Sequence, residues 1–553
     1  MQRFFVVPLI AALALIGRSP TTLRAEPPPK QLKKGPEQVY IDHGVMISLP
    51  SRNSESSIHK SFQFRNPLTD ADLKKLPNLP YPFGISVRSD KITDEGAAHL
   101  GKLTNLRSLS LILASITDEG VKRLTELKKL EKLRLLSSKI TDESVKHISR
   151  LRHLKLLTLD NSNISPEALK HLKELKQLRQ LKLTGGISDD VLDVLDSINM
   201  AGTLGSSKYG VDAKNYDQLP LELNLSRSRV TFRGLKYLRG MRQLDWLILG
   251  DSTTDASLRE LRDLDQVRSL NIDGPKVTDA GLAHLPELDN LAALYLSDVS
   301  IGRDGMSHLS RCPKLTELVF SRSQLSGAAL RRLEKLSGLQ KLGLGDPDLT
   351  DQGTEVLASL ERLEHLNLSG TKITDETVKH IRGLRNLKWL SLNRTRVTAP
   401  GVKLLKGLDK LEYLYLPTID DDILAALVEN QQLHLLYSHA SSEVAPNGMT
   451  VITGLQLSNS PISDRGLGQL TELKHLRSLA VPRTKITDAG LRHLADLEQL
   501  ERVYFDQTSI TDEGLRHLAE LPNLKRVSLR GTKVTDDGVR TFREAKPECD
   551  VVR

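Results

Sequence analysis

Aliphatic residues recur along this chain at a nearly constant interval, and each is followed by a short polar phrase. The interval is clearest in ITDEGAAHLGKLTNLRSLSLILAS, residues 92–115, after which ITDEG begins again at Ile116. We term the residue that opens each phrase the anchor of a repeat. Of the 18 intervals between anchors, 13 are 24 residues long, and a fixed period of this size predicts a solenoid. The 19 anchors, all aliphatic but one, are Leu68, Ile92, Ile116, Ile140, Ile164, Ile187, Val230, Thr253, Val277, Ile301, Leu325, Leu349, Ile373, Val397, Ile419, Ile462, Ile486, Ile510 and Val534.

Two hydrophobic periods alternate within each repeat. Leu109 and Leu111 are separated by one residue, which predicts a short strand, whereas Val121 and Leu124 have the spacing of a helical turn. The Thr or Ser after each anchor is expected to cap that helix, with acidic residues at its positive end. Glycine at the fifth position, as in Gly120, is expected to relieve crowding between adjacent turns of the solenoid. Neither half can bury its leucines alone, so stacked repeats should share one core beneath a parallel sheet.

The strand half of the repeat resembles the leucine-rich repeat family, whose signature is L-x-x-L-x-L-x-x-[N/C]-x-L. Leu363, Leu366, Leu368, Thr371 and Ile373 lie on this signature. The resemblance implies an α/β solenoid, a curved horseshoe with parallel strands on its concave face and short helices on its convex face. The repeats look like the TDxGL type of large bacterial extracytoplasmic proteins, and the resemblance covers residues 68–553.

The chain departs from that signature where the family carries Asn or Cys. A hydroxyl residue stands there in most repeats, and we expect it to bond the turn backbone in a similar but weaker way. These hydroxyl residues are Ser138, Ser162, Ser228, Ser323, Thr371, Thr395, Ser460, Thr484, Thr508 and Thr532.

Two intervals between anchors, Ile187 to Val230 and Ile419 to Ile462, are 43 residues long, one repeat plus 19. The extra residues are either tolerated surface loops or segments that flank a binding surface. The predicted division of the chain is a signal peptide (1–25), a Pro/Lys-rich disordered tether (26–38), an N-terminal cap (39–67), a first run of repeats (68–196), an insertion (197–219), a second run (220–429), an insertion (430–449) and a third run with a C-terminal cap (450–553). A strand or hairpin is expected in the first cap, from Val39 to Leu49, and a final strand within 545–553.

The N-terminus favours export from the cytoplasm. Arg3 precedes an apolar run over residues 4–16, and Leu23–Ala25 is a possible cleavage site. An uncleaved signal anchor is the alternative, although the apolar run is short for a membrane span. We therefore expect a secreted or periplasmic protein without a span in its mature part.

Composition and charge narrow the function classes. Removal of the first 25 residues takes away three arginines and no acid, which lowers the formal charge from +9 to +6. A mixed, solvated surface explains this small excess better than nucleic-acid binding does. Cys312 and Cys549 are too few for a disulfide framework and are expected to be separate thiols.

Catalytic and metal-binding signatures are weak in this sequence. Eight histidines lie seven residues after an anchor, a row that does not converge on a point as zinc ligands must. The acidic cluster at residues 420–422 lacks the spacing of a calcium loop. We expect no catalytic residue, cofactor or metal. The eight histidines are His99, His147, His171, His284, His308, His380, His493 and His517.

Aromatic residues are rare, at 4%, yet several occupy strand positions that point away from the leucine core. Consecutive repeats should stack His365, Trp389 and Tyr413 in one column about 5 Å apart, with Tyr415 in the next. Exposed aromatics near charged residues are typical of binding hot spots, although large side chains could also simply fill a shallow concave surface. The candidate partner-binding residues are Trp246, Tyr295, His365, Trp389, Tyr413, Tyr415 and Tyr504.

The sequence thus favours a non-catalytic scaffold that binds a protein partner on its concave face. A carbohydrate-binding or adhesion module of the cell envelope is the main alternative, because aromatic columns also suit sugar stacking. A passive envelope scaffold and an enzyme are further possibilities. The sequence does not identify the partner or the oligomeric state.

Overall fold

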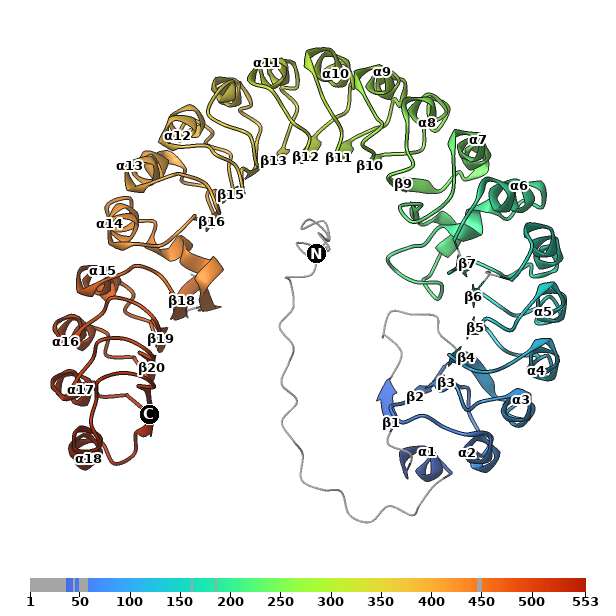
Figure 1. Ribbon diagram of the computed structural model, residues 1–553, viewed down its shortest axis with the longest axis horizontal. Coiled ribbons are helices and arrows are strands. Elements are labelled where there is room, and N and C mark those ends of the chain that lie inside the picture. The colour runs from blue at the N-terminus through green and yellow to red at the C-terminus, as the bar shows by residue number, and fades with distance from the viewer. Residues whose placement is uncertain (1–35, 43–44, 49–57, 161–162, 185, 445–449) are drawn as a thin grey trace.

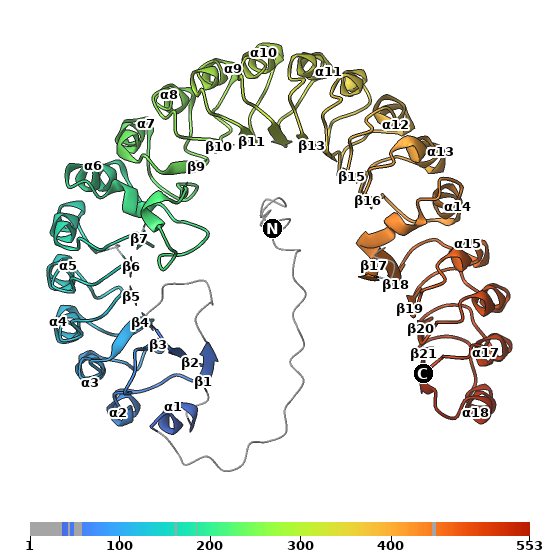
Figure 2. The same cartoon turned by 180° about the vertical axis from the view of Figure 1, so that it is seen from behind.

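The chain folds into an open arch with strands along its inner side and helices along its outer side (Figure 1). The same arrangement is seen from behind in Figure 2, where the two ends of the arch face each other across the opening. The predicted signal peptide and nearly all of the predicted tether lie outside the described residues. The computed structural model describes residues 36–42, 45–48, 58–160, 163–184, 186–444 and 450–553.

The strands form three sheets, and neighbours are parallel except in the pairs β1–β2 and β17–β18. The seven-stranded sheet contains β1 (Val45–Ser48), β2 (Lys60–Phe64), β3 (Phe83–Arg88), β4 (Leu106–Ile112), β5 (Lys132–Leu136), β6 (Leu156–Leu159) and β7 (Gln180–Leu183). The nine-stranded sheet contains β8 (Leu221–Asn224), β9 (Leu244–Leu249), β10 (Ser269–Asp273), β11 (Ala293–Ser297), β12 (Glu317–Ser321), β13 (Lys341–Gly345), β14 (His365–Asn367), β15 (Trp389–Ser391) and β16 (Tyr413–Tyr415). The six-stranded sheet contains β17 (Ala440–Val444), β18 (Thr450–Gln456), β19 (Ser478–Ala480), β20 (Arg502–Tyr504), β21 (Arg526–Ser528) and β22 (Asp550–Val552), the last being the final strand expected from the sequence.

Short helices cover the outer side, and most begin directly after the Thr or Ser that follows an anchor. The α-helices are α1 (Gln38–Asp42), α2 (Asp70–Lys75), α3 (Asp94–Leu100), α4 (Asp118–Leu124), α5 (Asp142–Ile148), α6 (Asp189–Ser197), α7 (Phe232–Leu235), α8 (Asp255–Arg259), α9 (Asp279–Leu282), α10 (Arg303–Leu309), α11 (Gly327–Leu330), α12 (Asp375–Ile381), α13 (Ala399–Lys403), α14 (Asp421–Glu429), α15 (Asp464–Gln469), α16 (Asp488–Leu491), α17 (Asp512–Ala519) and α18 (Asp536–Ala545). The 3₁₀ segments are η1 (Pro166–Glu174), η2 (Ala201–Leu204), η3 (Tyr216–Gln218), η4 (Lys236–Gly240), η5 (Leu285–Glu287), η6 (Arg331–Lys335), η7 (Thr354–Ser359), η8 (Leu404–Gly407), η9 (Leu433–His439), η10 (Leu470–Glu472) and η11 (Arg492–Asp496).

Leucines of the strand and helix halves meet in one continuous core between the sheets and the helices. Leu366 and Leu368 from the strand side and Ile381 from the helix side are all fully buried. The predicted fold class, an α/β horseshoe solenoid with a parallel inner face, is therefore confirmed.

Seven of the ten hydroxyl residues that replace the family's Asn or Cys bond backbone carbonyls at the turn after the strand, namely Ser228, Ser323, Thr371, Thr395, Thr484, Thr508 and Thr532. Thr371 Oγ1 donates to the carbonyl of Leu368 at 2.7 Å, and Thr532 Oγ1 donates to that of Leu529 at 2.7 Å. These two bonds close the turn three residues back within the same repeat, whereas Ser323 Oγ also lies 3.2 Å from the carbonyl of Leu296 in the preceding repeat and so can link the two.

The start of the N-terminal cap differs from the predicted strand. Residues 38–42 form helix α1, because Tyr40 packs its ring 4.5 Å from that of Phe62 and its hydroxyl donates to the carbonyl of Pro77 at 2.8 Å. Phe83 also contacts Tyr40, with ring centroids 5.9 Å apart. This aromatic packing covers the first open end of the core and overrides the alternating pattern, and only β1 matches the expected strand.

Each TD motif links its own repeat to the next one. Asp70 Oδ1 accepts the backbone N–H of Thr93 at 2.9 Å, and Asp70 Oδ2 accepts the Thr93 hydroxyl at 2.6 Å. The same threonine receives the Glu95 N–H at 3.3 Å, so it caps its helix as predicted while it also donates to the preceding repeat. We term this series of bonds the aspartate ladder. It occurs at 13 of the 18 junctions between repeats, with backbone distances of 2.7–2.9 Å.

At most ladder junctions the glycine of the TDxG phrase lies directly against the carboxylate, whereas Ser144, Ala168 and Thr377 occupy this slot at the other three. A Cβ atom on Gly490 would lie well inside van der Waals contact with Asp464 Oδ1, and Gly120 and Gly514 meet the aspartate of the preceding repeat in the same way. The predicted relief of crowding thus has a specific cause, since the glycine leaves room for the carboxylate that joins two repeats.

The aspartate ladder continues across both long intervals. Asp189 accepts the N–H of Thr231 at 2.8 Å, 42 residues later, and Asp421 accepts that of Ser463 at 2.8 Å over the same separation. The helical side is therefore continuous where the sheet is interrupted, and both insertions leave the stack on its strand side.

We predict that Gly490→Ala destabilises the protein by about 1–3 kcal/mol, because the new methyl group forces Asp464 away from Thr487. The matched control is Gly383→Ala, whose Cβ would meet nothing within 4 Å. Thermal unfolding followed by circular dichroism should place the first variant clearly below the second. Equal melting temperatures would show that the glycine slot does not constrain the stack.

A second prediction concerns pH. Burial raises the pKa of Asp351, but hydrogen bonds from Thr374 and Thr377 outweigh burial and hold this pKa below its ordinary value. Asp351→Asn should cost about 1–3 kcal/mol at pH 7. A group whose pKa is lower in the folded than in the unfolded state stabilises the fold at pH values above its unfolded pKa. The difference in free energy of unfolding between Asp351→Asn and wild type should therefore persist to about pH 5 and shrink below about pH 4.

Urea unfolding at a series of pH values measures this difference directly. Asp409→Asn, at an exposed carboxylate, is the control and should show little change at any pH. A difference in free energy of unfolding between Asp351→Asn and wild type that stays constant down to pH 3 would contradict stabilisation by the ionised Asp351 carboxylate.

Candidate functional site

Two rows of side chains run across the nine-stranded sheet on its concave face. Strand register places His365, Trp389 and Tyr413 side by side in adjacent strands, with Tyr415 in the neighbouring row, as the repeat spacing predicted. Row one consists of Trp246, Ser269, Ala293, Glu317, Lys341, His365, Trp389 and Tyr413. Row two consists of Ile248, Asn271, Tyr295, Val319, Gly343, Asn367, Ser391 and Tyr415.

One aromatic group lies at the β9–β11 end of these rows. The rings of Trp246 and Tyr295 are stacked with centroids 6.3 Å apart, and Trp246 Nε1 donates to Asn271 Oδ1 at 2.6 Å. The Tyr295 hydroxyl donates to Glu317 at 2.7 Å, and Lys341 donates to the other oxygen of Glu317 at 3.1 Å. Burial, followed by the charge and hydrogen bond of Glu317, raises the pKa of Tyr295 far above its ordinary range, so it remains a neutral donor.

A second aromatic group lies at the β14–β16 end, and one of its members is not exposed as predicted. Trp389 is only 8% exposed, and its ring lies 5.3 Å from that of Tyr415. The prediction of an exposed Trp389 was wrong because parallel strands are about 4.8 Å apart, so an indole ring must lie against its neighbours. Truncation of Trp389 would therefore also disturb packing. Tyr413, by contrast, is 46% exposed.

Two ring nitrogens on this second group have no hydrogen-bond partner within the described part of the chain. They are Nε1 of Trp389 and Nδ1 of His365, both buried. The pKa of His365 is lowered, mainly by burial and secondly by the charge of Lys341. This imidazole is therefore neutral at pH 7. Tyr504 is half-buried on β20 and belongs to neither group, since β20 lies in the six-stranded sheet.

The first insertion folds over the inner side of the seven-stranded sheet. Asp212 pairs with Lys132 of β5, and Arg179 donates to the carbonyl of Val211 at 2.8 Å. Tyr216 lies against Arg179, with the guanidinium 5.4 Å from the ring centroid, and belongs to a small apolar cluster that Leu156 of β6 packs against. The insertion therefore occupies concave surface over β5–β7.

The second insertion contains η9 and the β17–β18 hairpin, and it also projects toward the inside of the arch (Figures 1 and 2). The sequence left open whether the insertions are plain surface loops or flank a binding surface. They lie at the two ends of the nine-stranded sheet, so the two rows and both aromatic groups lie in a compartment between them.

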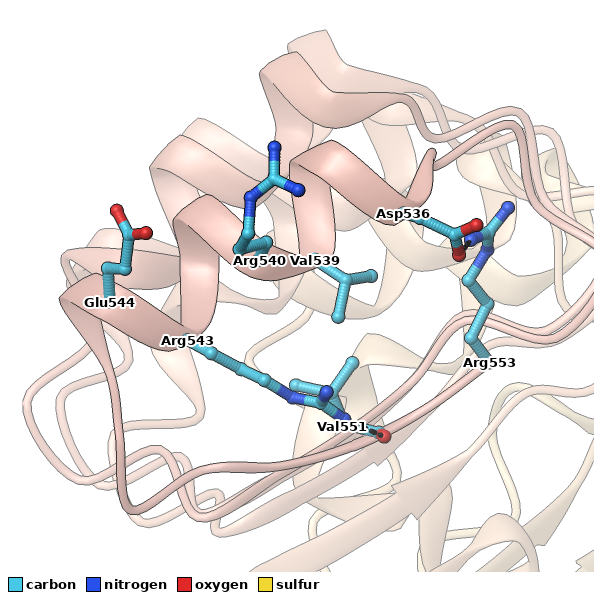
Figure 3. A pocket seen from close by; sticks show the side chains of 7 residues that line it. All are labelled: Asp536, Val539, Arg540, Arg543, Glu544, Val551 and Arg553. Carbon is cyan, nitrogen blue, oxygen red and sulfur yellow. Dashed lines mark hydrogen bonds and ion pairs between the residues drawn. The ribbon is translucent and has the colours of Figure 1, made fainter.

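A cavity of about 630 Å³ lies at the other end of the molecule, between α18 and β22 (Figure 3). Arg553 pairs there with Asp536, the ladder aspartate of the last repeat, and Arg543 donates to the carbonyl of Val551 at 3.4 Å. Val539 and Val551 form its apolar floor. These arginines cover the last turn of the core, and the cavity does not bring together groups typical of catalysis.

The histidines and acidic residues noted in the sequence contact neighbouring side chains and helix ends. His147 lies 3.8 Å from Glu143 on its own helix, and His380 Nδ1 lies 3.1 Å from the hydroxyl of Thr354. In the acidic cluster, Asp420 caps α14 through the Ile423 N–H, Asp421 is a ladder residue, and Asp422 pairs with Arg465. Across the described residues, no group of three or more His, Cys, Asp and Glu side chains is arranged to hold a metal ion.

Two further features concern the cysteines and the helices. Cys312 and Cys549 are free and buried, and burial raises the pKa of the Cys312 thiol to about 12. Among the helices of the described residues, none is both long and apolar enough to cross a membrane.

Comparisons with known proteins concern the repeat and the fold. A family model described as "Leucine Rich repeat" matches residues 362–379. The chain has no significant match among curated protein sequences. The family model does not test the resemblance to TDxGL repeats of bacterial extracytoplasmic proteins, which stays a prediction.

Solved structures with a similar course include a leucine-rich repeat protein of Leptospira interrogans, at 17% identity and a TM-score of 0.32 over 88% of this chain and 95% of that one. An internalin of Listeria monocytogenes is 17% identical, with a TM-score of 0.18 over 88% of each chain. The TLR13–ssRNA13 complex is 16% identical, with a TM-score of 0.49 over 89% of this chain and 77% of that one. At such identities and scores the likeness does not extend to ligands.

The family assignment rests on the chain's own repeats. Residues 362–379 match the family model and fall in the 24-residue unit that recurs from Leu68 onward, and each unit contributes a parallel strand and a helical segment to one stack. The chain is therefore a leucine-rich repeat protein.

Proposed function

We propose that this protein is a non-catalytic scaffold that binds a protein partner on the concave face of its nine-stranded sheet. The observation that carries this proposal is the pair of aromatic groups on rows one and two, enclosed between the two insertions. Exposed aromatic area is typical of binding surfaces, and Tyr413, with 46% of its surface exposed, supplies it here.

The distribution of side chains favours a protein partner. Hydrogen-bonded polar groups, such as Glu317 with Tyr295 and Lys341, lie between the two aromatic groups, and this mixture resembles the polar and aromatic surroundings of protein interfaces. Carbohydrate binding remains the competing outcome, because stacked rings such as Trp246 and Tyr295 also suit sugars.

The proposal also includes export from the cytoplasm and the absence of catalysis. Export from the cytoplasm rests on residues 1–25, which lie outside the described residues, and N-terminal sequencing of the mature protein tests it. Absence of catalysis rests on the engagement of the acidic residues and histidines in capping, ladder bonds and ion pairs.

We predict that Tyr413→Ala weakens binding of the protein partner about thirtyfold, because truncation of an interface aromatic typically costs about 2 kcal/mol. The fold should be unaffected, since this side chain lies outside the leucine core. The partner is first identified by placing a photo-crosslinking amino acid at position 413 in cells that produce the protein, and its affinity is then measured by calorimetry.

The control is Lys379→Ala with Arg382→Ala on the convex helix α12, which should leave affinity within about twofold of wild type. A photo-crosslinker at position 382 should capture no protein specifically. A specific crosslink from 382 but not from 413 would place the partner on the convex side. Binding to a glycan array that is lost in Tyr413→Ala, without a protein crosslink, would favour the carbohydrate function.

A further inference from the structure

Several charged side chains along the central sheet are paired with one another. Lys341 donates to Glu317 at 3.1 Å, and Lys388 donates to Glu364 at 2.8 Å, in each case one strand away. Arg268 pairs with Asp245 in the same manner. The cations named here are thus neutralised by acids of neighbouring strands, and the central sheet offers aromatic surface without an excess of cations.

The concave face of β18–β22, which we term the C-terminal arm, is different. Register places Arg502 of β20 directly beside Arg526 of β21, and both side chains are exposed. Arg526 is 3.5 Å from Asp550, whereas Arg502 has no ion-pair partner among the described residues. Like charges opposite each other on adjacent strands are destabilising. The leucine core does not require arginine at these outward positions, so their presence suggests a role outside folding.

Other basic side chains surround this pair. Lys525 lies just before β21 and pairs with Glu501 at 3.3 Å, and Arg477 is exposed just before β19. Tyr504 follows Arg502 by two residues and is half-buried on the same face. Within this basic group, Arg502 is the exposed strand residue without an ion-pair partner among the described residues.

The concave face of β1–β7, which we term the N-terminal arm, is also basic, but the first insertion partly covers it. The first insertion supplies Asp212 to Lys132, and Lys155 shares Glu131 with Arg107. An exposed pair of arginines on adjacent strands, of which Arg502 has no ion-pair partner among the described residues, is therefore a feature of the C-terminal arm.

We propose that Arg502 and Arg526 bind carboxylates on an acidic surface segment of the protein partner. A planar guanidinium matches a carboxylate in a bidentate geometry, and two of them about 4.8 Å apart suit neighbouring acidic side chains. A uniformly negative polymer, such as a nucleic acid or a sulfated glycan, would meet neutralised cations and aromatic rings on the adjoining central sheet. A protein surface, which mixes acidic and apolar areas, matches both regions. This inference rests on the proposed function and specifies the chemistry of the partner.

The experiment uses the mature protein and fluorescein-labelled poly-L-glutamate of about 20 residues, with binding followed by fluorescence anisotropy at low salt. The variant Arg502→Gln with Arg526→Gln should bind the probe at least about tenfold more weakly, because each arginine loses a charge-assisted hydrogen bond. Its melting temperature should not fall, since the substitutions relieve repulsion between the two guanidinium groups. Added salt should weaken wild-type binding.

The charge-matched control is Lys379→Gln with Arg382→Gln on α12, expected to change probe binding less than about twofold. An equal loss of probe affinity in both variants would show that the effect depends only on net charge and would overturn the proposal. No binding of poly-L-glutamate, or tight binding of heparin or poly-dT in its place, would overturn it as well.

Tyr413→Ala separates this inference from the proposed function, because it should leave probe binding unchanged. A protein crosslink at 413 together with a failed probe assay would remove only the acidic-segment inference. Arginine-dependent probe binding without a crosslink at 413 would support the arginine site and contradict the placement of the partner on the central sheet.

Discussion

Most junctions between repeats in this structure are fixed by a carboxylate that one repeat presents to the next. In the first such link Asp70 accepts both polar hydrogens of Thr93, and in the same arrangement Gly96 leaves the space that the carboxylate fills. One interaction therefore accounts for three letters of the TDxG phrase. Because the bonds join neighbouring repeats, they set the helical sides at a fixed spacing, and the leucines then bury between turns already in register.

The ladder also explains how two insertions of equal length are accommodated. Asp189 and Asp421 bond the threonine or serine of the next repeat across 42 residues, so the insertion is confined to the strand side, where the sheet ends and a new one begins. The outcome is a single curved support with an inner face divided into three parts. The three parts are a partly covered face on β1–β7, an aromatic central sheet whose cations Arg268, Lys341 and Lys388 are paired with acids, and a face on β18–β22 with exposed arginines.

The features that the repeat itself determines could be predicted from the sequence. Period, strand and helix positions, and the column from His365 to Tyr413 follow from local patterns that recur, so each repeat supports the assignment of the others. Features that depend on one unrepeated contact did not follow. Burial of Trp389 against Tyr415 depends on ring size and strand spacing, and contact between Asp212 and Lys132 joins residues 80 positions apart. The aspartate was predicted only to favour its own helix, because its second role requires knowledge of the stacked neighbour.

Five repeats lack the ladder aspartate, having Pro166, Phe232, Arg303, Gly327 and Ala399 in its place, yet the stack continues through all of them. The shared leucine core is therefore sufficient at individual junctions, and the ladder adds fixed register to it. Both contributions come from the helical side and the interior. Outward positions of the strands, such as those of Tyr413 and Arg502, contribute little to either. The exposed outward positions of the inner face are thus where side chains can vary with the least effect on the fold, and the residues proposed here to bind a partner, Tyr413 and Arg502, lie at such positions.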